Sequence, residues 1–211
     1  CVRLNNEDRV GVLVLPNDGA LLMLADGMGG HAAGEVAAQM ALDAVGDACK
    51  VGLTEPVHEA LQQALIFANE RIRNEAEANP VQRGMGTTAT VLVLVGKRVW
   101  FIHIGDSRLY RLRGGCLEQL SEDHSLVAEM VRSGLLTPPE AVGHPSRNVI
   151  VRALGGDPAI RPQISSEPLA VQIDDVFLLS SDGLHDQVQP RELADLLEAT
   201  PAIACQALVN L

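Results

Sequence analysis

The sequence has few aromatic residues and no long apolar run, and both shortages narrow the class of protein. Only 2% of its 211 residues are aromatic, while 47% are hydrophobic. A chain of this length and composition can bury one large core but is short for two. No apolar run reaches the length that spans a membrane. We therefore expect residues 1–211 to form a single domain with no membrane partner.

Cysteine is also scarce. The four cysteines, Cys1, Cys49, Cys116 and Cys205, lie far apart, with no CxxC pair and no zinc-type spacing. This spacing favours small buried side chains in a reducing compartment over a disulfide framework. We expect a cytoplasmic protein.

Basic residues are outnumbered by acidic ones. Lys and Arg number 16 against 27 Asp and Glu, which gives a formal net charge of -11 and an isoelectric point near 4.9. Such a surface repels nucleic acid and anionic membranes and tolerates cations. Divalent metals or basic substrate segments are better partners for it than DNA.

The periodicity of the apolar residues predicts an α+β fold. Apolar runs over 10–15 and 20–25 flank Pro16-Asn17-Asp18-Gly19, which predicts a hairpin. Helical spacing follows over 33–49 and again from Pro56. Strands are predicted over 87–95, 99–104, 108–113 and 116–120. Short hairpins imply antiparallel pairing, and two successive helices argue against a repeating βαβ pattern.

The second half of the chain changes in composition. Residues 121–158 contain one short helical pattern and several prolines and glycines, which is typical of a flap on the rim of a domain. A last hairpin is expected through Asp174-Asp175, leading into "VFLLSSDGL". A helix over 190–199 follows.

Three apolar strands each end in an acid. The stretches "LLMLADG", "VWFIHIGDS" and "VFLLSSDG" contain Asp26, Asp106 and Asp182. One Asp-Gly pair alone is more often a turn than a functional site. If the three strand ends meet, however, their carboxylates repel and lose water, which is costly unless a cation lies between them. Hard divalent ions prefer such oxygen ligands.

Neighbouring residues can supply further ligands. Glu7, Asp8, the Gly27 carbonyl and Asp186 add oxygen atoms, so two or three ions are plausible. Paired Mg²⁺ or Mn²⁺ ions acidify a bridging water and clamp a phosphoryl group. Arg3 can make a bidentate contact to phosphate, although an ordinary surface cation is the plainer reading for this residue alone.

Seven motifs in order carry a family resemblance. They are "RLNNED", "DGMGGH", "GMGTTAT", "GDSRLYRL", "EDHSLV", "NVIVRALGG" and "LLSSDGLHD". Together they resemble the metal-dependent protein phosphatases (PPM family, type 2C serine/threonine phosphatases), especially the compact bacterial members. The resemblance implies a central antiparallel β-sandwich flanked by helix pairs, a four-layer αββα fold, with the metal cluster at one end and the flap beside it.

The resemblance also implies residue roles. Asp26 would bridge two Mn²⁺ or Mg²⁺ ions, and Asp182 would bind the first of them. The second ion would be bound by Gly27, Asp8 and Glu7, and a weaker third ion by Asp106, Asp182 and Asp186. Arg3 would bind the substrate phosphate. The implied reaction is hydrolysis of phosphoserine or phosphothreonine by a metal-bridging hydroxide, without a phosphoenzyme. Phosphorylated proteins, a cognate serine/threonine kinase and a monomeric state are expected.

Two departures from the family pattern keep an alternative open. Met28 stands where many relatives have a histidine, so His31 becomes the candidate proton donor, or merely a helix-start residue. The chain reaches Leu211 before the closing Asp-Asn motif, so we expect a C-terminally incomplete domain. The alternative function is a catalytically weak phosphoprotein-binding module that retains the fold.

Two other histidines are expected to be structural. His103 alternates with apolar residues on one strand, as a satisfied core histidine does. Asp123, His124 and Ser125 are adjacent in sequence, but a catalytic triad is assembled across space, so a serine-hydrolase site is not expected.

Overall fold

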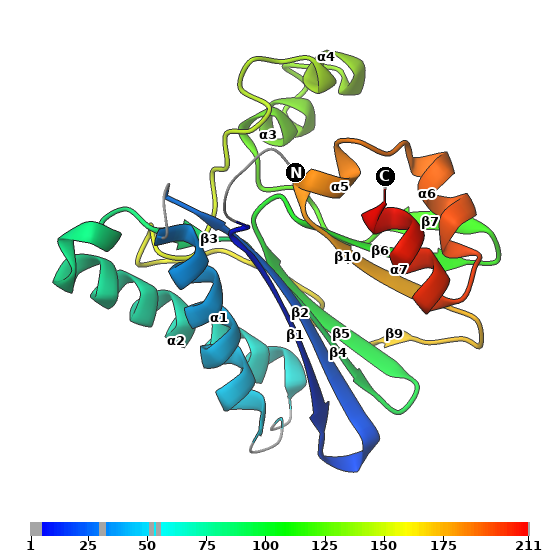
Figure 1. Cartoon of the computed structure of the whole chain (residues 1–211), viewed down its shortest axis with the longest axis horizontal. Coiled ribbons are helices and arrows are strands. Elements are labelled where there is room, and N and C mark those ends of the chain that lie inside the picture. The colour runs from blue at the N-terminus through cyan, green and yellow to red at the C-terminus, as the bar shows by residue number, and fades with distance from the viewer. Residues whose placement is uncertain (1–5, 30–32, 51–52, 54–55, 211) are drawn as a thin grey trace.

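The computed structural model describes residues 6–29, 33–50, 53 and 56–210. Within them the chain forms four layers, in which two antiparallel sheets face each other and helices cover both outer faces (Figure 1). This is the predicted αββα arrangement. None of the helices in these ranges is long and apolar enough to cross a membrane.

Both sheets are antiparallel throughout. The first contains β1 (Asp8–Leu15), β2 (Gly19–Met28), β3 (Gly86–Thr87), β4 (Ala89–Val95), β5 (Arg98–Ile104), β8 (Gln163–Ile164) and β9 (Leu169–Ala170). Its main path runs β1-β2-β4-β5-β8, with β3 on β2 and β9 on β5. The second sheet has the order β10-β6-β7, from β6 (Arg108–Arg113), β7 (Cys116–Gln119) and β10 (Val176–Ser180).

Helices cover the outer faces and one end. They are α1 (Ala33–Lys50), α2 (Val57–Ala78), α3 (Leu126–Arg132), α4 (Pro138–Val142), α5 (Asp182–His185), α6 (Pro190–Leu197) and α7 (Pro201–Val209). Short 3-10 turns occupy Pro16–Asp18 and Pro80–Gln82. Figure 1 shows α1 and α2 beside the first sheet, α6 and α7 beside the second, and α3 and α4 projecting at one end.

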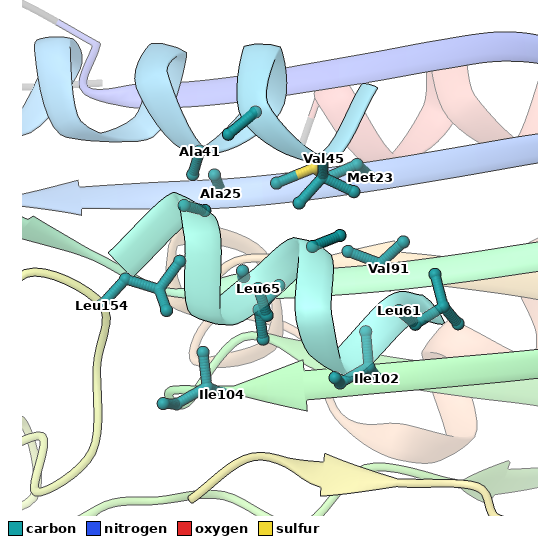
Figure 2. Close-up of a cluster of buried hydrophobic side chains, with 14 of the residues drawn as sticks. Met23, Ala25, Ala41, Val45, Leu61, Leu65, Val91, Ile102, Ile104 and Leu154 are labelled. Atoms are coloured by element: carbon teal, nitrogen blue, oxygen red, sulfur yellow. The ribbon is translucent and has the colours of Figure 1, made fainter. Parts of the chain in front are cut away.

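The largest core lies between α1, α2 and the first sheet. Figure 2 shows Leu61 and Leu65 of α2 pointing toward the strands, and both side chains are fully buried. Burial of one such leucine stabilises the fold by about 1.5–3 kcal/mol. A second cluster fills the space between the sheets, and a third lies between β6 and the two C-terminal helices.

Glycine sets the distance between β2 and α1. A Cβ atom added to Gly27 would lie 2.2 Å from the carbonyl oxygen of Gly34, in the first turn of α1. A Cβ atom on Gly34 would in turn lie 2.8 Å from the Gly27 carbonyl carbon. The "DGMGGHAAG" stretch therefore needs these two glycines because backbone packs directly on backbone.

The expected elements are mostly confirmed, with one error of pairing. The first hairpin forms, and β2 continues past Ala25 so that Asp26 lies within the strand. The last hairpin was predicted wrongly, because β9 pairs with β5 while β10 pairs with β6. The turn at Asp174 exists, with φ of 66°, but it connects the two sheets.

Candidate metal centre

Two carboxylates come from the first hairpin. Asp8 begins β1 and lies directly opposite Asp26 of β2 in the antiparallel register. Side chains of directly opposed residues project from the same face of a sheet. The hairpin register therefore places these two acids side by side.

Two more acids follow the ends of strands in different sheets. Asp106 comes two residues after β5, and Asp182 comes two residues after β10, as the first residue of α5. The hydroxyl of Ser181 donates to Oδ2 of Asp8 at 2.9 Å, which ties the end of β10 to the start of β1. The sandwich therefore gathers at one end the acids that three separate sequence motifs carry.

The proximity of these acids to one another shifts their pKa values. Burial raises the pKa of Asp26 to about 8, and the charges of Asp8, Asp182 and Asp106 act in the same direction. The pKa of Asp106 rises to about 6 through burial and the charge of Asp182. A cation bound among these groups removes the repulsion that favours the protonated forms.

The donor set fits hard divalent ions. Every candidate ligand is an oxygen atom, which is what Mg²⁺ and Mn²⁺ prefer. Among the described residues, no three or more His, Cys, Asp and Glu side chains form a ready-made cage.

The remaining predicted site residues are Glu7, Asp186, Arg3 and His31. The Glu7 carbonyl accepts a hydrogen bond from the Gly27 amide at 3.3 Å, so the Glu7 backbone adjoins the centre. Asp186 is exposed and lines the same cavity as Asp106 and Asp182. Arg3 and His31 lie outside the described residues.

Buried threonine and serine hydroxyls support the backbone of Asp26. Thr88 Oγ1 accepts from the Asp26 amide at 2.9 Å and contacts Ser107 Oγ at 2.9 Å. Thr87 Oγ1 donates to the Asp26 carbonyl at 3.0 Å. All three hydroxyl residues are buried. Thr87 and Thr88 therefore both satisfy backbone groups of Asp26.

A cavity of about 860 Å³ opens beside Asp106, Asp182 and Asp186. The segment with α3 and α4 forms one wall, and α5 and the start of α6 form another. Arg108 in the cavity makes a bidentate ion pair with Asp123, with nitrogen to oxygen distances of 2.7 to 3.1 Å. The cavity is large enough for part of a peptide.

The structural histidines are confirmed as such. His103 is fully buried and bonds to Thr90 Oγ1 at 2.9 Å and to the Gly105 carbonyl at 3.0 Å. Burial lowers the pKa of His103 to about 4 and that of His124 to about 3. Asp123 pairs with Arg108, and Ser125 caps α3. These contacts leave no catalytic triad among Asp123, His124 and Ser125.

Sequence reasoning missed the supporting contacts of Ser107 and Ser181. Each serine adjoins one of the strand-end acids, in "GDS" and "SSD". That adjacency was a usable signal, because a hydroxyl next to a buried acid can satisfy the backbone or carboxylate of a neighbouring element.

Comparisons with known proteins agree with this geometry. The sequence model of the Protein phosphatase 2C family matches residues 2–207. The chain is 36% identical to protein phosphatase PhpP of Streptococcus pneumoniae over 205 residues, which is 96% of this chain and 82% of that protein. It therefore belongs to the protein phosphatase 2C family of metal-dependent serine/threonine phosphatases.

Solved structures show the same fold. The serine/threonine phosphatase PstP/Ppp of Mycobacterium tuberculosis superposes with a TM-score of 0.89 at 38% identity, over 100% of this chain and 86% of that one. The catalytic domain of PstP in complex with two manganese ions gives a TM-score of 0.86 at 37% identity, again over 100% and 86% of the two chains.

Proposed function

We propose that the acid cluster binds two Mn²⁺ or Mg²⁺ ions, with a weaker third, and that the chain hydrolyses phosphoserine and phosphothreonine in proteins. Asp26 would be shared by two ions. Asp182 would hold the first, Asp8, Glu7 and the Gly27 carbonyl the second, and Asp106, Asp182 and Asp186 the third. The observation that carries the proposal is that separate elements bring Asp8, Asp26, Asp106 and Asp182 together at one end of the sandwich. Burial and the three neighbouring acids also raise the pKa of Asp26.

The bound ions and the protein residues have different roles in the proposed reaction. Bound divalent ions acidify water and neutralise phosphoryl charge. Thr88 and Ser181 hold the backbone of Asp26 and the carboxylate of Asp8 in position. The cavity beside Asp106 receives the residues that flank the phosphorylated side chain. Arg3 binds the phosphate, and His31 donates a proton to the leaving oxygen.

The names of the relatives support the choice of substrate. They are protein phosphatases and serine/threonine protein phosphatases, which act on phosphorylated proteins. A serine/threonine kinase must generate such substrates, so a cognate kinase is the expected partner. The described cysteines are free thiols, which favours a reducing, cytoplasmic location. The net charge of -11 favours a monomer through repulsion between copies.

Titration calorimetry with Mn²⁺ tests the metal assignment. Wild-type protein should bind at least two ions, and Asp26→Asn should lose the tight binding of both because it removes the shared ligand. Asp195→Asn is the matched control, since Asp195 is exposed on α6. Equal isotherms for wild type and Asp26→Asn would refute the assignment.

A further inference from the structure

The root of the residue 121–158 segment is attached to the peptide that precedes Asp106. The segment leaves and returns at one place, where the Val151 amide donates to the His124 carbonyl at 2.9 Å and Leu126 donates to Val149 at 2.8 Å. At the same place, the His124 amide donates to the Gly105 carbonyl at 2.7 Å. His124 is therefore one of the residues that join the projecting segment to the site, beside the contacts of Asp123 with Arg108 and of Leu154 with Thr87.

Two histidine rings complete this attachment. The Gly105 amide donates to Nδ1 of His124 at 3.1 Å, so Nδ1 is the acceptor and the ring carries its proton on Nε2. His103 donates from Nε2 to the Gly105 carbonyl, because a carbonyl can only accept. The two rings stack with centroids 5.1 Å apart. Both polar groups of the Gly105 backbone are thus occupied by histidines.

Gly105 has little freedom to move out of this arrangement. Its φ is 117°, and a Cβ atom there would lie 2.4 Å from the side chain of Thr88. Thr88 is the residue whose hydroxyl bonds to the Asp26 amide. A displacement of Gly105 therefore reaches both Asp106, its neighbour in sequence, and the support of Asp26.

We propose that His124 is a positioning residue that fixes Gly105 and thereby Asp106, so that ion binding at Asp106 depends on how the root of the 121–158 segment is seated. The proposal rests on the weaker third ion of the proposed function. By linkage, a ligand that shifts this root changes the ion affinity, and the ion changes the affinity for that ligand by the same factor.

Two substitutions separate the hydrogen bond from the bulk of the ring. His124→Leu fills the space but removes the acceptor, whereas His124→Asn offers Oδ1 near the position of Nδ1. Removing a residue that supports a metal ligand typically weakens ion binding by about 10- to 100-fold. We expect His124→Leu to weaken the weakest Mn²⁺ site by about tenfold or more, and His124→Asn to restore most of the loss. Leu61→Ala, in the distant core, controls for general destabilisation.

A second readout needs no metal. Hydrogen exchange of the Gly105 amide, measured by NMR on metal-free protein, should be faster in His124→Leu and return to the wild-type rate in His124→Asn. In Leu61→Ala, the exchange rate of the Gly105 amide relative to the other amides should stay as in wild type. Unchanged exchange and an unchanged isotherm in His124→Leu would overturn the proposal.

Asp106→Asn distinguishes this failure from failure of the underlying assignment. It should abolish the weakest Mn²⁺ site and keep the two tighter ones. If Asp106→Asn weakens that site and His124→Leu does not, the positioning role is wrong and the third ion stands. If Asp106→Asn changes nothing, the third ion and the positioning role are both wrong, while the two-ion phosphatase is untouched.

Discussion

Asp8 and Asp26 face each other across the first hairpin, and the charge of Asp8 helps to raise the pKa of Asp26. Two acids in this relation destabilise a folded chain that has no cation between them. On the proposed function, the same pair would bind divalent ions. The metal-free fold would then be less stable than the metal-bound fold, because a bound ion removes the repulsion between the two acids.

The first prediction concerns the pH dependence of the metal-free protein. The pKa of Asp26 is about 8 in the fold, against an ordinary value of 3.8 for an aspartate. The folded state therefore holds this proton more tightly than the unfolded state, and stability falls as pH rises from about 4 to about 8. Thermal melting of metal-free wild type and Asp26→Asn at several pH values measures the effect.

Wild type and Asp26→Asn should differ in how their stability depends on pH. Asp26→Asn should be as stable as wild type near pH 4 and more stable at pH 8, and the stabilisation of wild type by Mn²⁺ should grow over the same range. A difference in melting temperature that does not change with pH would contradict the assignment.

The second prediction concerns the backbone contact between β2 and α1. Gly27→Ala places a Cβ atom 2.2 Å from the Gly34 carbonyl, so it should destabilise the fold by about 3 kcal/mol or more. Gly46→Ala, inside α1 and with nothing within 4 Å of the new Cβ atom, should stabilise by about 0.5–1 kcal/mol. Denaturant unfolding of both variants gives the comparison, and similar effects from the two would show that the close approach is not needed.

The strand-end acids could be predicted from sequence because their signal is local. A run of apolar residues that stops at an aspartate marks the end of a buried strand, and Asp26, Asp106 and Asp182 all lie at or near such ends. The hairpin register then follows from the short turn at Pro16–Asp18. Family resemblance added the roles, which spacing alone leaves open.

The error at Asp174-Asp175 has a different origin. Turn residues indicate where a chain reverses but not which strand it then joins. Arg113 of β6 contacts both segments here, because it donates to both carboxylate oxygens of Asp175, at 2.7 and 2.6 Å, and to the Ala170 carbonyl at 2.8 Å. These long-range contacts join the end of β9 and the start of β10 to the end of β6, and no local sequence pattern reveals them. The short helices α4 and α5, of five and four residues, carry too little periodicity to be predicted.

The third prediction concerns the support behind Asp26. Thr88→Val keeps the shape but removes the hydroxyl that accepts from the Asp26 amide and contacts Ser107, so it should cost about 1–3 kcal/mol. It should also weaken Mn²⁺ binding, by about 10-fold or more. Thr88→Ser retains the hydroxyl and should recover most of the affinity in a calorimetric titration. Equal Mn²⁺ affinity in the valine and serine variants would rule out the support role.

The most direct test of the account is phosphate release from a phosphothreonine peptide, with and without Mn²⁺, by wild type and Asp182→Asn. The account predicts turnover by wild type only with metal and loss of turnover in Asp182→Asn, because Asp182 is proposed to serve two ion sites. Turnover near the wild-type rate in Asp182→Asn would contradict the metal-centred mechanism. Binding of the peptide without any release of phosphate by wild type would favour a phosphoprotein-binding module instead.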